Sequence, residues 1–255
     1  MQLSEVKALI TGGVSGLGLA LARKVVANRG QAVLLDINDP AGAAAENELG
    51  SAVHYLHTDV TSEQAIADAV QVAVERMGLI NLAVNCAGVV GAGRVLGREA
   101  PMALDFFTKA IQINLIGSFN VIKAAGAAME SNPPGAEGER GVIISTASVA
   151  AFEGQIGQAA YSASKAGIAG MTLPIAREFA RIGVRVNTIA PGIFMTPMVE
   201  GMPEQVQASL SASIPFPSRL GKAEEFADLA AHIVENAYIN GATIRLDGAV
   251  RLAPK

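Results

Sequence analysis

The stretch "TGGVSGLGLA", residues 11–20, links an apolar run to a segment with helical periodicity. Its glycines Gly12, Gly16 and Gly18 have the spacing G-x-x-x-G-x-G. A turn without side chains lets the backbone approach phosphate oxygens closely, and a helix that starts there points free N–H groups at them. The pattern therefore predicts a pyrophosphate site between a strand and a helix. The alternative is a tight strand-to-helix turn that binds nothing.

An acidic residue follows at the end of the next apolar run, "AVLLDI" (32–37). Asp36 stands about 20 residues beyond Gly16, where a carboxylate can accept hydrogen bonds from an adenosine ribose and repel a 2′-phosphate. Its neighbours Ile37 and Asn38 offer no positive charge to such a phosphate. We therefore predict NAD rather than NADP as the cofactor. The alternative is an aspartate in a surface turn.

Short apolar runs alternate with helix-like stretches along the chain. Most runs are continuously apolar, as in strands buried on both faces of a parallel sheet. The sequence predicts an α/β fold: one doubly wound Rossmann-type domain over residues 1–255, with a parallel sheet of about seven strands and helices on both faces. Residues 1–150 would form mainly the cofactor-binding half. Strands are expected over 6–11, 32–37, 52–60, 81–88, 141–148, 184–191 and 242–248, and helices over 16–30, 41–50, 62–77 and 102–130.

The composition of the 255-residue chain indicates a globular protein with a large core, because 51% of its residues are hydrophobic and 16% are charged. A net charge of −4, with no cluster of Lys or Arg, argues against nucleic acid or an anionic membrane as a partner. One cysteine excludes an internal disulfide, and three histidines without ligand spacing predict no metal site. With neither a membrane-spanning apolar run nor a secretory signal, we expect a cytoplasmic protein, or a mitochondrial one in a eukaryote.

The segment "YSASK", residues 161–165, places a phenol and an ammonium one helical turn apart. Tyr161 and Lys165, at positions i and i+4, share one helix face. A nearby ammonium favours the phenolate and is expected to lower the pKa of Tyr161 from its usual value of about 10. A phenol tuned in this way can serve as a general acid and base. An exposed helical pair is the alternative, because the spacing Y-x-x-x-K is common by chance.

Further polar residues are expected near this pair. Ser148 ends the apolar run 141–148, and the segment "NCAG" (85–88) ends another. Ligands of open parallel sheets bind beyond the carboxyl ends of the strands, so both segments should lie at one rim of the sheet. Asn114 lies within the long helix expected over 102–130.

Together these motifs resemble the short-chain dehydrogenase/reductase family. The shared motifs are "TGGVSGLG", "DV" at 59–60, "NCAG", Asn114, Ser148, "YSASK", "IAPG" at 189–192 and "LDG" at 246–248, in the family's order over nearly the whole chain. The resemblance implies an oxidoreductase in which Tyr161 is the general acid/base and Ser148 polarises the substrate oxygen. Lys165 would lower the tyrosine pKa and bind the nicotinamide ribose, and Asn114 would anchor a water for proton relay.

The resemblance also implies where the cofactor binds. Asp59 and Val60 would contact the adenine, and the residues from Pro191 onward would lie on the nicotinamide side. The implied cofactor contacts are Gly12, Ser15, Gly16, Leu17, Gly18, Asp36, Asp59, Val60, Asn85, Ala87, Gly88, Tyr161, Lys165, Pro191, Gly192, Ile193 and Thr196.

Three stretches, 141–178, 214–221 and 240–251, are similar to the 3-hydroxyacyl-CoA dehydrogenases of this family. This similarity implies hydride transfer between NAD(H) and a 3-hydroxyacyl-CoA/3-ketoacyl-CoA pair, and a homotetramer. One alternative is an NAD-dependent dehydrogenase of a hydroxysteroid or another apolar secondary alcohol. A second is a non-catalytic NAD-binding scaffold on the same fold, because a fold alone does not determine function.

The substrate side is expected to follow the last cofactor motif. Residues 190–221, rich in Met, Ser and Pro, are interpreted as an apolar lid over the substrate, with a packing helix or a subunit contact as the alternative. Gln155, Gln158 and Phe194 are the candidate substrate contacts. Phe152, in the same loop as the two glutamines, is a further candidate for the pocket wall.

Overall fold

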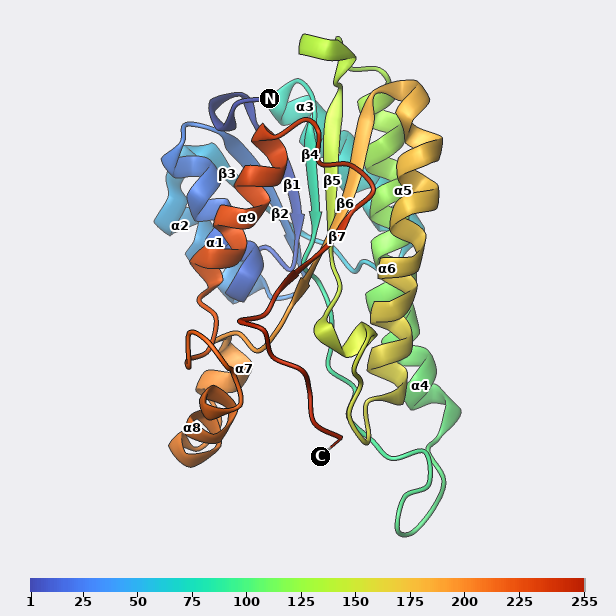
Figure 1. Cartoon of the computed structure of the whole chain (residues 1–255). Coiled ribbons are helices and arrows are strands. Elements are labelled where there is room, and N and C mark those ends of the chain that lie inside the picture. The colour runs from blue at the N-terminus through green and yellow to red at the C-terminus, as the bar shows by residue number, and fades with distance from the viewer. Residues whose placement is uncertain (255) are drawn as a thin grey trace.

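Within residues 1–254, a parallel sheet of seven strands forms the centre of the molecule (Figure 1). The structure, a computed structural model, describes these residues apart from the side chains of Pro197 and Met198; Lys255, the last residue of the expected domain, lies outside the described residues. The strand order is β3-β2-β1-β4-β5-β6-β7, which confirms the predicted doubly wound fold. The strands are β1 (Lys7–Thr11), β2 (Gln31–Asp36), β3 (Val53–His57), β4 (Leu82–Asn85), β5 (Gly141–Thr146), β6 (Val184–Pro191) and β7 (Thr243–Leu246).

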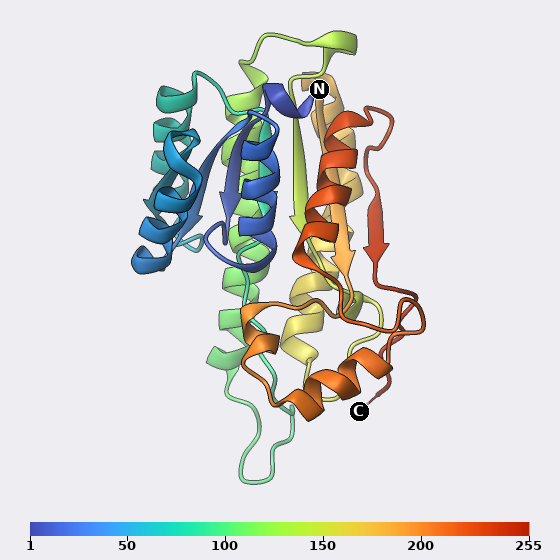
Figure 2. The same cartoon turned by 90° about the vertical axis from the view of Figure 1, so that its left-hand side faces the viewer.

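Helices cover both faces of the sheet, as the turned view shows (Figure 2). Successive strand residues point to opposite faces. Ile10 and Leu34 therefore belong to one hydrophobic core, and Leu9 and Val33 belong to the other. The first core is covered by α1 (Gly16–Ala27), α2 (Asp39–Leu49) and α9 (Ala223–Glu235), and the second by α3 (Glu63–Met77), α5 (Gly117–Glu130) and α6 (Ala159–Phe179).

The helix expected over 102–130 is a continuous helical run that contains a π-helical turn. α4 (Leu104–Ala110) leads into this turn, Ile111–Ile116, and α5 follows it. A π-helical turn inside an α-helix frequently marks a functional position. Here it contains Asn114, which the sequence analysis placed in an ordinary helix.

Several strands end earlier than expected: β5 ends at Thr146 and β7 at Leu246, and the difference is largest for β3 and β4. β3 ends at His57 and β4 at Asn85, because the residues that follow leave the ladder and turn towards the cavity described below. Short 3₁₀ turns lie at Leu3–Glu5, Gly50–Ala52, Ala136–Gly138, Val149–Ala151 and Ala180–Ile182.

A small additional layer lies beyond the carboxyl ends of the strands (Figures 1 and 2). It contains α7 (Pro197–Glu200), α8 (Glu204–Ala212) and the C-terminal residues. A separate apolar cluster joins these segments. Its members are Val199, Ile214, Leu220 and Val250, with Leu210 and Leu252 packed against them.

Among residues 1–254, no helix combines the length and the apolar character needed to span a bilayer. In the same part of the chain, no group of three or more His, Cys, Asp or Glu side chains comes together as a metal site requires.

Candidate active site

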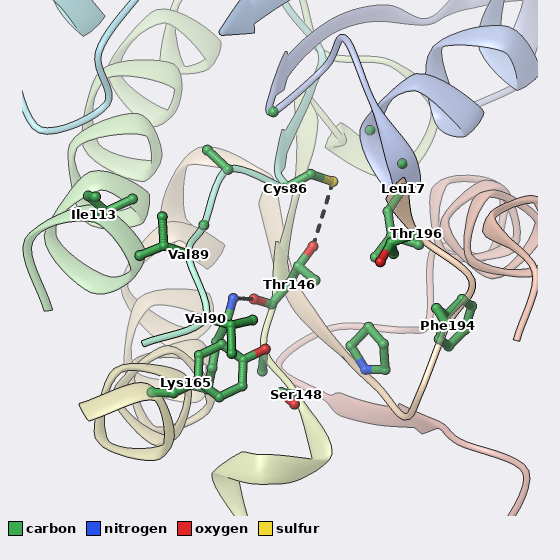
Figure 3. A pocket seen from close by; sticks show the side chains of 18 of the residues that line it. Leu17, Cys86, Val89, Val90, Ile113, Thr146, Ser148, Lys165, Phe194 and Thr196 are labelled. Carbon is green, nitrogen blue, oxygen red and sulfur yellow. Dashed lines mark hydrogen bonds between the residues drawn. The ribbon is translucent and has the colours of Figure 1, made fainter. Parts of the chain in front are cut away.

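A cavity of about 1110 Å³ opens at the carboxyl ends of the central strands. β1 and β4 are neighbours in the sheet but not in the chain, so their connections leave in opposite directions and a crevice forms between them. The glycine-rich turn after β1 and residues 86–90 after β4 line this crevice. Figure 3 shows Leu17 and Thr196 on one side of it and Val89 and Ile113 on the other.

Most of the site residues expected from the sequence line this cavity. They are Gly12, Ser15, Gly16, Leu17, Gly18, Asp36, Asp59, Val60, Ala87, Gly88, Ser148, Gln155, Gln158, Tyr161, Lys165, Pro191, Gly192, Ile193, Phe194 and Thr196. Two of the expected residues, Asn85 and Asn114, are buried behind the cavity wall.

The glycine-rich turn permits the close backbone approach that a dinucleotide needs. A Cβ atom on Gly18 would lie 2.3 Å from the carbonyl oxygen of Gly12, and one on Gly12 would lie 2.7 Å from the nitrogen of Ala87. Ser15 is the N-cap of α1, but its side chain makes no capping hydrogen bond. The first N–H groups of α1 are therefore available to an anion, so these residues fit the pyrophosphate of a nicotinamide dinucleotide.

Asp36 ends β2 and contributes to the cavity wall. Its Oδ1 atom accepts hydrogen bonds from the N–H groups of Ile37, at 2.8 Å, and Asn38, at 3.2 Å. Oδ2 is the oxygen left to accept a hydrogen bond from a ribose hydroxyl. Among the described residues that line the cavity, only Lys109, on α4, and Lys165, on α6, are cationic.

Ser148, Tyr161 and Lys165 come together from the end of β5 and the first turns of α6. The Ser148 Oγ atom accepts a hydrogen bond from the N–H of Ala150 at 3.1 Å, so its own proton can be donated to Tyr161 or to a ligand. Lys165 Nζ donates to the carbonyl oxygen of Thr146 at 2.7 Å (Figure 3) and lies 5.8 Å from the centre of the Tyr161 ring. The backbone at the end of β5 therefore holds the ammonium beside the phenol.

Burial is the main influence on both titrating groups. Burial raises the pKa of Tyr161, and the hydrogen bond with Ser148 acts in the opposite direction. The expected lowering of the Tyr161 pKa is therefore wrong, because loss of water around the buried phenol is the largest influence. Burial also lowers the pKa of Lys165, to about 8. Each group is pushed towards its neutral form.

Asn114 connects the π-helical turn to the segment after β4. Its Oδ1 atom accepts a hydrogen bond from the N–H of Val89 at 2.8 Å, and its Nδ2 atom donates to the Val89 carbonyl at 3.0 Å and to Ser164 Oγ at 2.9 Å. A Cβ atom on Gly88 would lie 3.1 Å from Asn114 Oδ1 and 3.6 Å from Lys165 Nζ. Asn114 thus holds the cavity wall beside the lysine without lining the cavity itself.

Asn85, expected as a cofactor contact, contacts the neighbouring strand instead of lining the cavity. Its Nδ2 atom donates to Ser145 Oγ on β5 at 3.2 Å, and the side chain is buried. Asn85 is the last residue of β4 and still pairs in the ladder, so Ala87 and Gly88 are the residues that reach the cavity.

The substrate side of the cavity includes Gln155, Gln158 and Phe194, as expected. Phe152 does not line it: the ring is half exposed, and the guanidinium of Arg245 lies over it at 5.5 Å. Gln155 also binds the C-terminal segment, because its Nε2 atom donates to the carbonyl of Ala253 at 3.0 Å.

Several residues at the site were not predicted from the sequence, among them Val90, Lys109 and Ile113 in the cavity wall; Thr11 and Leu252 are two further examples. Thr11 Oγ1 accepts hydrogen bonds from the N–H groups of Cys86 and Ala87, both at 3.2 Å, and so joins the ends of β1 and β4. Leu252, close to the end of the chain, lines the cavity. Leu252 belongs to none of the motifs, so its position at the cavity could not be predicted from the sequence.

These features define the class of protein. The family described as short chain dehydrogenase matches residues 6–207, and the chain belongs to this family. It is an oxidoreductase, a dehydrogenase that uses a nicotinamide cofactor. The family and the fold expected from the motifs are thereby confirmed, and the alternative of a non-catalytic scaffold is disfavoured.

Close relatives carry one name. The 3-hydroxyacyl-CoA dehydrogenase type-2 of Bos taurus is 51% identical over 97% of this chain and 95% of its own length. The protein of the same name from Drosophila melanogaster is 48% identical over 96% of this chain and 97% of its own length. The crystal structure of 3-hydroxyacyl-CoA dehydrogenase type-2 from Mycobacterium avium matches with a TM-score of 0.92 at 42% identity, over 97% of this chain and 96% of that chain.

The buried ammonium of Lys165 is expected to make stability depend on pH. Its pKa is about 8 in the folded protein, against an ordinary value of 10.5. Below the pKa of the folded protein, Lys165 is protonated in both the folded and the unfolded state, so folding carries the full free-energy cost of burying the charge. Between the two values the folded state releases its proton first, so stability rises with pH. Relative to Lys165→Met, we expect the wild-type free energy of unfolding to rise by roughly 2 kcal/mol between pH 7 and pH 10.

Urea unfolding of both proteins at the two pH values measures this difference. The variant serves as the control for titrating groups distant from Lys165, because their surroundings do not change. A difference in unfolding free energy that stays constant with pH would contradict the burial of a charged lysine.

Proposed function

We propose that the protein transfers a hydride between NAD(H) and a 3-hydroxyacyl-CoA/3-ketoacyl-CoA pair. The observation that carries this proposal is a single cavity that extends from the glycine-rich turn, past Ser148 and Tyr161, to an apolar wall. The substrate class is supported by the names of relatives that are about half identical over nearly the whole chain.

The preference for NAD over NADP is part of this proposal. The carboxylate of Asp36 stands where the adenosine ribose is expected, and a negative charge there repels a 2′-phosphate. The two residues that follow it, Ile37 and Asn38, are uncharged. Nothing in this segment would compensate the charge of the phosphate of NADP.

The residues around the substrate oxygen support a defined path for the proton. We propose that the Ser148 hydroxyl donates a hydrogen bond to the oxygen at C3 and that Tyr161 exchanges a proton with this oxygen. In the reducing direction the phenol gives up its proton as C3 receives the hydride, which the nicotinamide supplies when bound. The raised pKa of Tyr161 keeps the phenol protonated and favours this role as an acid. In the oxidising direction the phenolate must form, and Lys165 is the cation placed to stabilise it.

We further propose that Lys165 binds the nicotinamide ribose and that Asn114 anchors a water for proton relay. The Asn114 side chain is committed to Val89 and Ser164, so its backbone carbonyl is the group to consider. That carbonyl lies in the π-helical turn and accepts a hydrogen bond from Ser118 Oγ at 2.7 Å.

Residues 190–221 are proposed as the lid over the acyl chain. Val199, Met202 and Leu210 from this region line the cavity. Their apolar side chains would exclude water from the reacting atoms. The same apolar surface could also accept a hydroxysteroid, so the assay below includes that alternative substrate.

A homotetramer is also part of the proposal. Exposed apolar side chains on two different helices, Phe119 on α5 and Leu173 on α6, are 47% and 44% accessible in the single chain. Apolar side chains exposed in this way suit a contact between subunits.

Replacing the phenol tests the assigned acid. Tyr161→Phe should reduce turnover by roughly a hundredfold or more, because general acid–base catalysis contributes effects of this size. The dissociation constant for NADH should change by less than about twofold, because the ring remains in place. Steady-state rates and NADH fluorescence titration measure the two quantities.

Tyr238→Phe is the matched control, because Tyr238 is fully exposed at 100% accessibility and the substitution removes the same hydroxyl group. Full activity in Tyr161→Phe would exclude the tyrosine as the proton donor.

Substrate class is tested by following NADH oxidation at 340 nm with acetoacetyl-CoA and, in parallel, with a 17-ketosteroid. The acetoacetyl-CoA reaction is repeated with NADPH in place of NADH. We expect much faster turnover of acetoacetyl-CoA with NADH than with NADPH, because Asp36 repels the additional phosphate. Slow thioester turnover with a fast ketosteroid reaction would move the function to the steroid alternative. Faster reaction with NADPH would refute the role given to Asp36.

A further inference from the structure

A tyrosine on the edge strand holds the segment that carries Asp36. β3 is the outermost strand next to β2, and α2 follows Asp36 directly (Figure 1). The hydroxyl of Tyr55, on β3, lies 3.0 Å from the carbonyl oxygen of Asp36 and 2.8 Å from Asp39 Oδ1, so its one proton is shared between two acceptors. The hydroxyl thus connects the end of β2 to the first residue of α2.

Asp39 is itself fixed by a second contact. His57 Nδ1, also on β3, lies 2.8 Å from the same Asp39 Oδ1 atom. Asn38, between the two aspartates, caps α2 by accepting a hydrogen bond from the N–H of Ala41 at 3.1 Å. Three contacts therefore hold the segment from Asp36 to Asp39: one at the backbone carbonyl of Asp36, one at the capping side chain of Asn38 and one at the carboxylate of Asp39.

The Tyr55 ring has little freedom to move the hydroxyl away. A Cβ atom on Gly42 of α2 would lie 2.4 Å from the ring, so the ring packs directly against the helix backbone. The N–H of Tyr55 donates to Glu46 Oε1 at 2.8 Å, which ties the strand to the same helix. Burial and the Asp39 carboxylate raise the pKa of Tyr55, so its hydroxyl keeps the proton that it donates.

The hydroxyl is not required to satisfy the Asp36 carbonyl. That oxygen also accepts the N–H of Thr58 at 2.8 Å. A phenylalanine would fill the same space against Gly42. The Tyr55 hydroxyl is therefore a second donor to the Asp36 carbonyl, beside Thr58, and it links this carbonyl to the Asp39 side chain.

We propose that Tyr55, anchored by Asp39, is a positioning residue for cofactor selection: its hydroxyl holds Asp36 in the orientation that binds the adenosine ribose of NAD(H). This inference rests on the proposed use of NAD(H). It is independent of the acyl-CoA substrate, because it concerns only the adenosine end of the cofactor. Pre-organising a binding group in this way strengthens binding by reducing the cost of ordering it.

The test is direct cofactor binding by Tyr55→Phe, measured by fluorescence titration with NADH and with NADPH. We expect the dissociation constant for NADH to rise by about threefold to tenfold, the effect of losing one hydrogen bond that orders the site. The value for NADPH should change by less than about twofold, because Asp36 does not favour its phosphate. At saturating NADH, kcat should stay at the wild-type level, since Tyr55 lies away from the reacting atoms.

Asp39→Asn gives an independent test, because it keeps Tyr55 and weakens the anchor of its hydroxyl. It should raise the NADH dissociation constant in the same direction. Tyr238→Phe again serves as the control, and its NADH affinity should equal that of the wild type. The thermal midpoint of each variant shows whether the fold is intact.

The possible results separate this inference from the cofactor proposal. Wild-type protein that binds NADPH as tightly as NADH would refute the cofactor proposal. Wild-type preference for NADH with an unchanged NADH affinity in Tyr55→Phe would refute the role of Tyr55 alone. Equal weakening of both cofactors, accompanied by a lower thermal midpoint, would also overturn it, because the hydroxyl would then be a general support of the fold.

Discussion

The parallel pairing of β1 with β4 is the constraint on which the site depends. It places Thr11 opposite Asn85, so the two strands end together and their connections leave in opposite directions. The Gly12 backbone can then approach Ala87 so closely that a Cβ atom on Gly12 would lie 2.7 Å from the Ala87 nitrogen. The crevice for a dinucleotide and the start of α1 follow from this one contact between strands that are distant in the sequence.

Burial gives the reacting groups their chemical character. Tyr161 and Lys165 both lie in a region with little water, which drives each towards its neutral form. The carbonyl of Thr146 offers the lysine a partner without an opposing charge. The protein therefore holds a protonated phenol beside a lysine of lowered pKa, an arrangement suited to transferring one proton in either direction. This arrangement depends on β5 and α6 being fixed by the sheet.

The periodic pattern of the sequence was sufficient to predict the seven-stranded sheet, and the glycine spacing was sufficient to place the crevice. The features of the site that could not be predicted from the sequence depend on tertiary contacts. Asn85 belongs to a motif at the rim, but its position in the ladder turns it towards Ser145. The pKa of Tyr161 depends on burial, which residue spacing does not report. Leu252 reaches the cavity from the far end of the chain, and Tyr55 contacts Asp36 from the adjacent strand. Neither residue belongs to a motif.

The proposed function requires that a hydride move between the cofactor and C3 of an acyl-CoA. The most direct measurement uses NADH deuterated at both C4 positions, with acetoacetyl-CoA as the acceptor and mass spectrometry of the product. We predict 3-hydroxybutyryl-CoA with one deuterium at C3. A product without deuterium at C3, or no thioester product while the deuterated NADH reduces a ketosteroid, would contradict it.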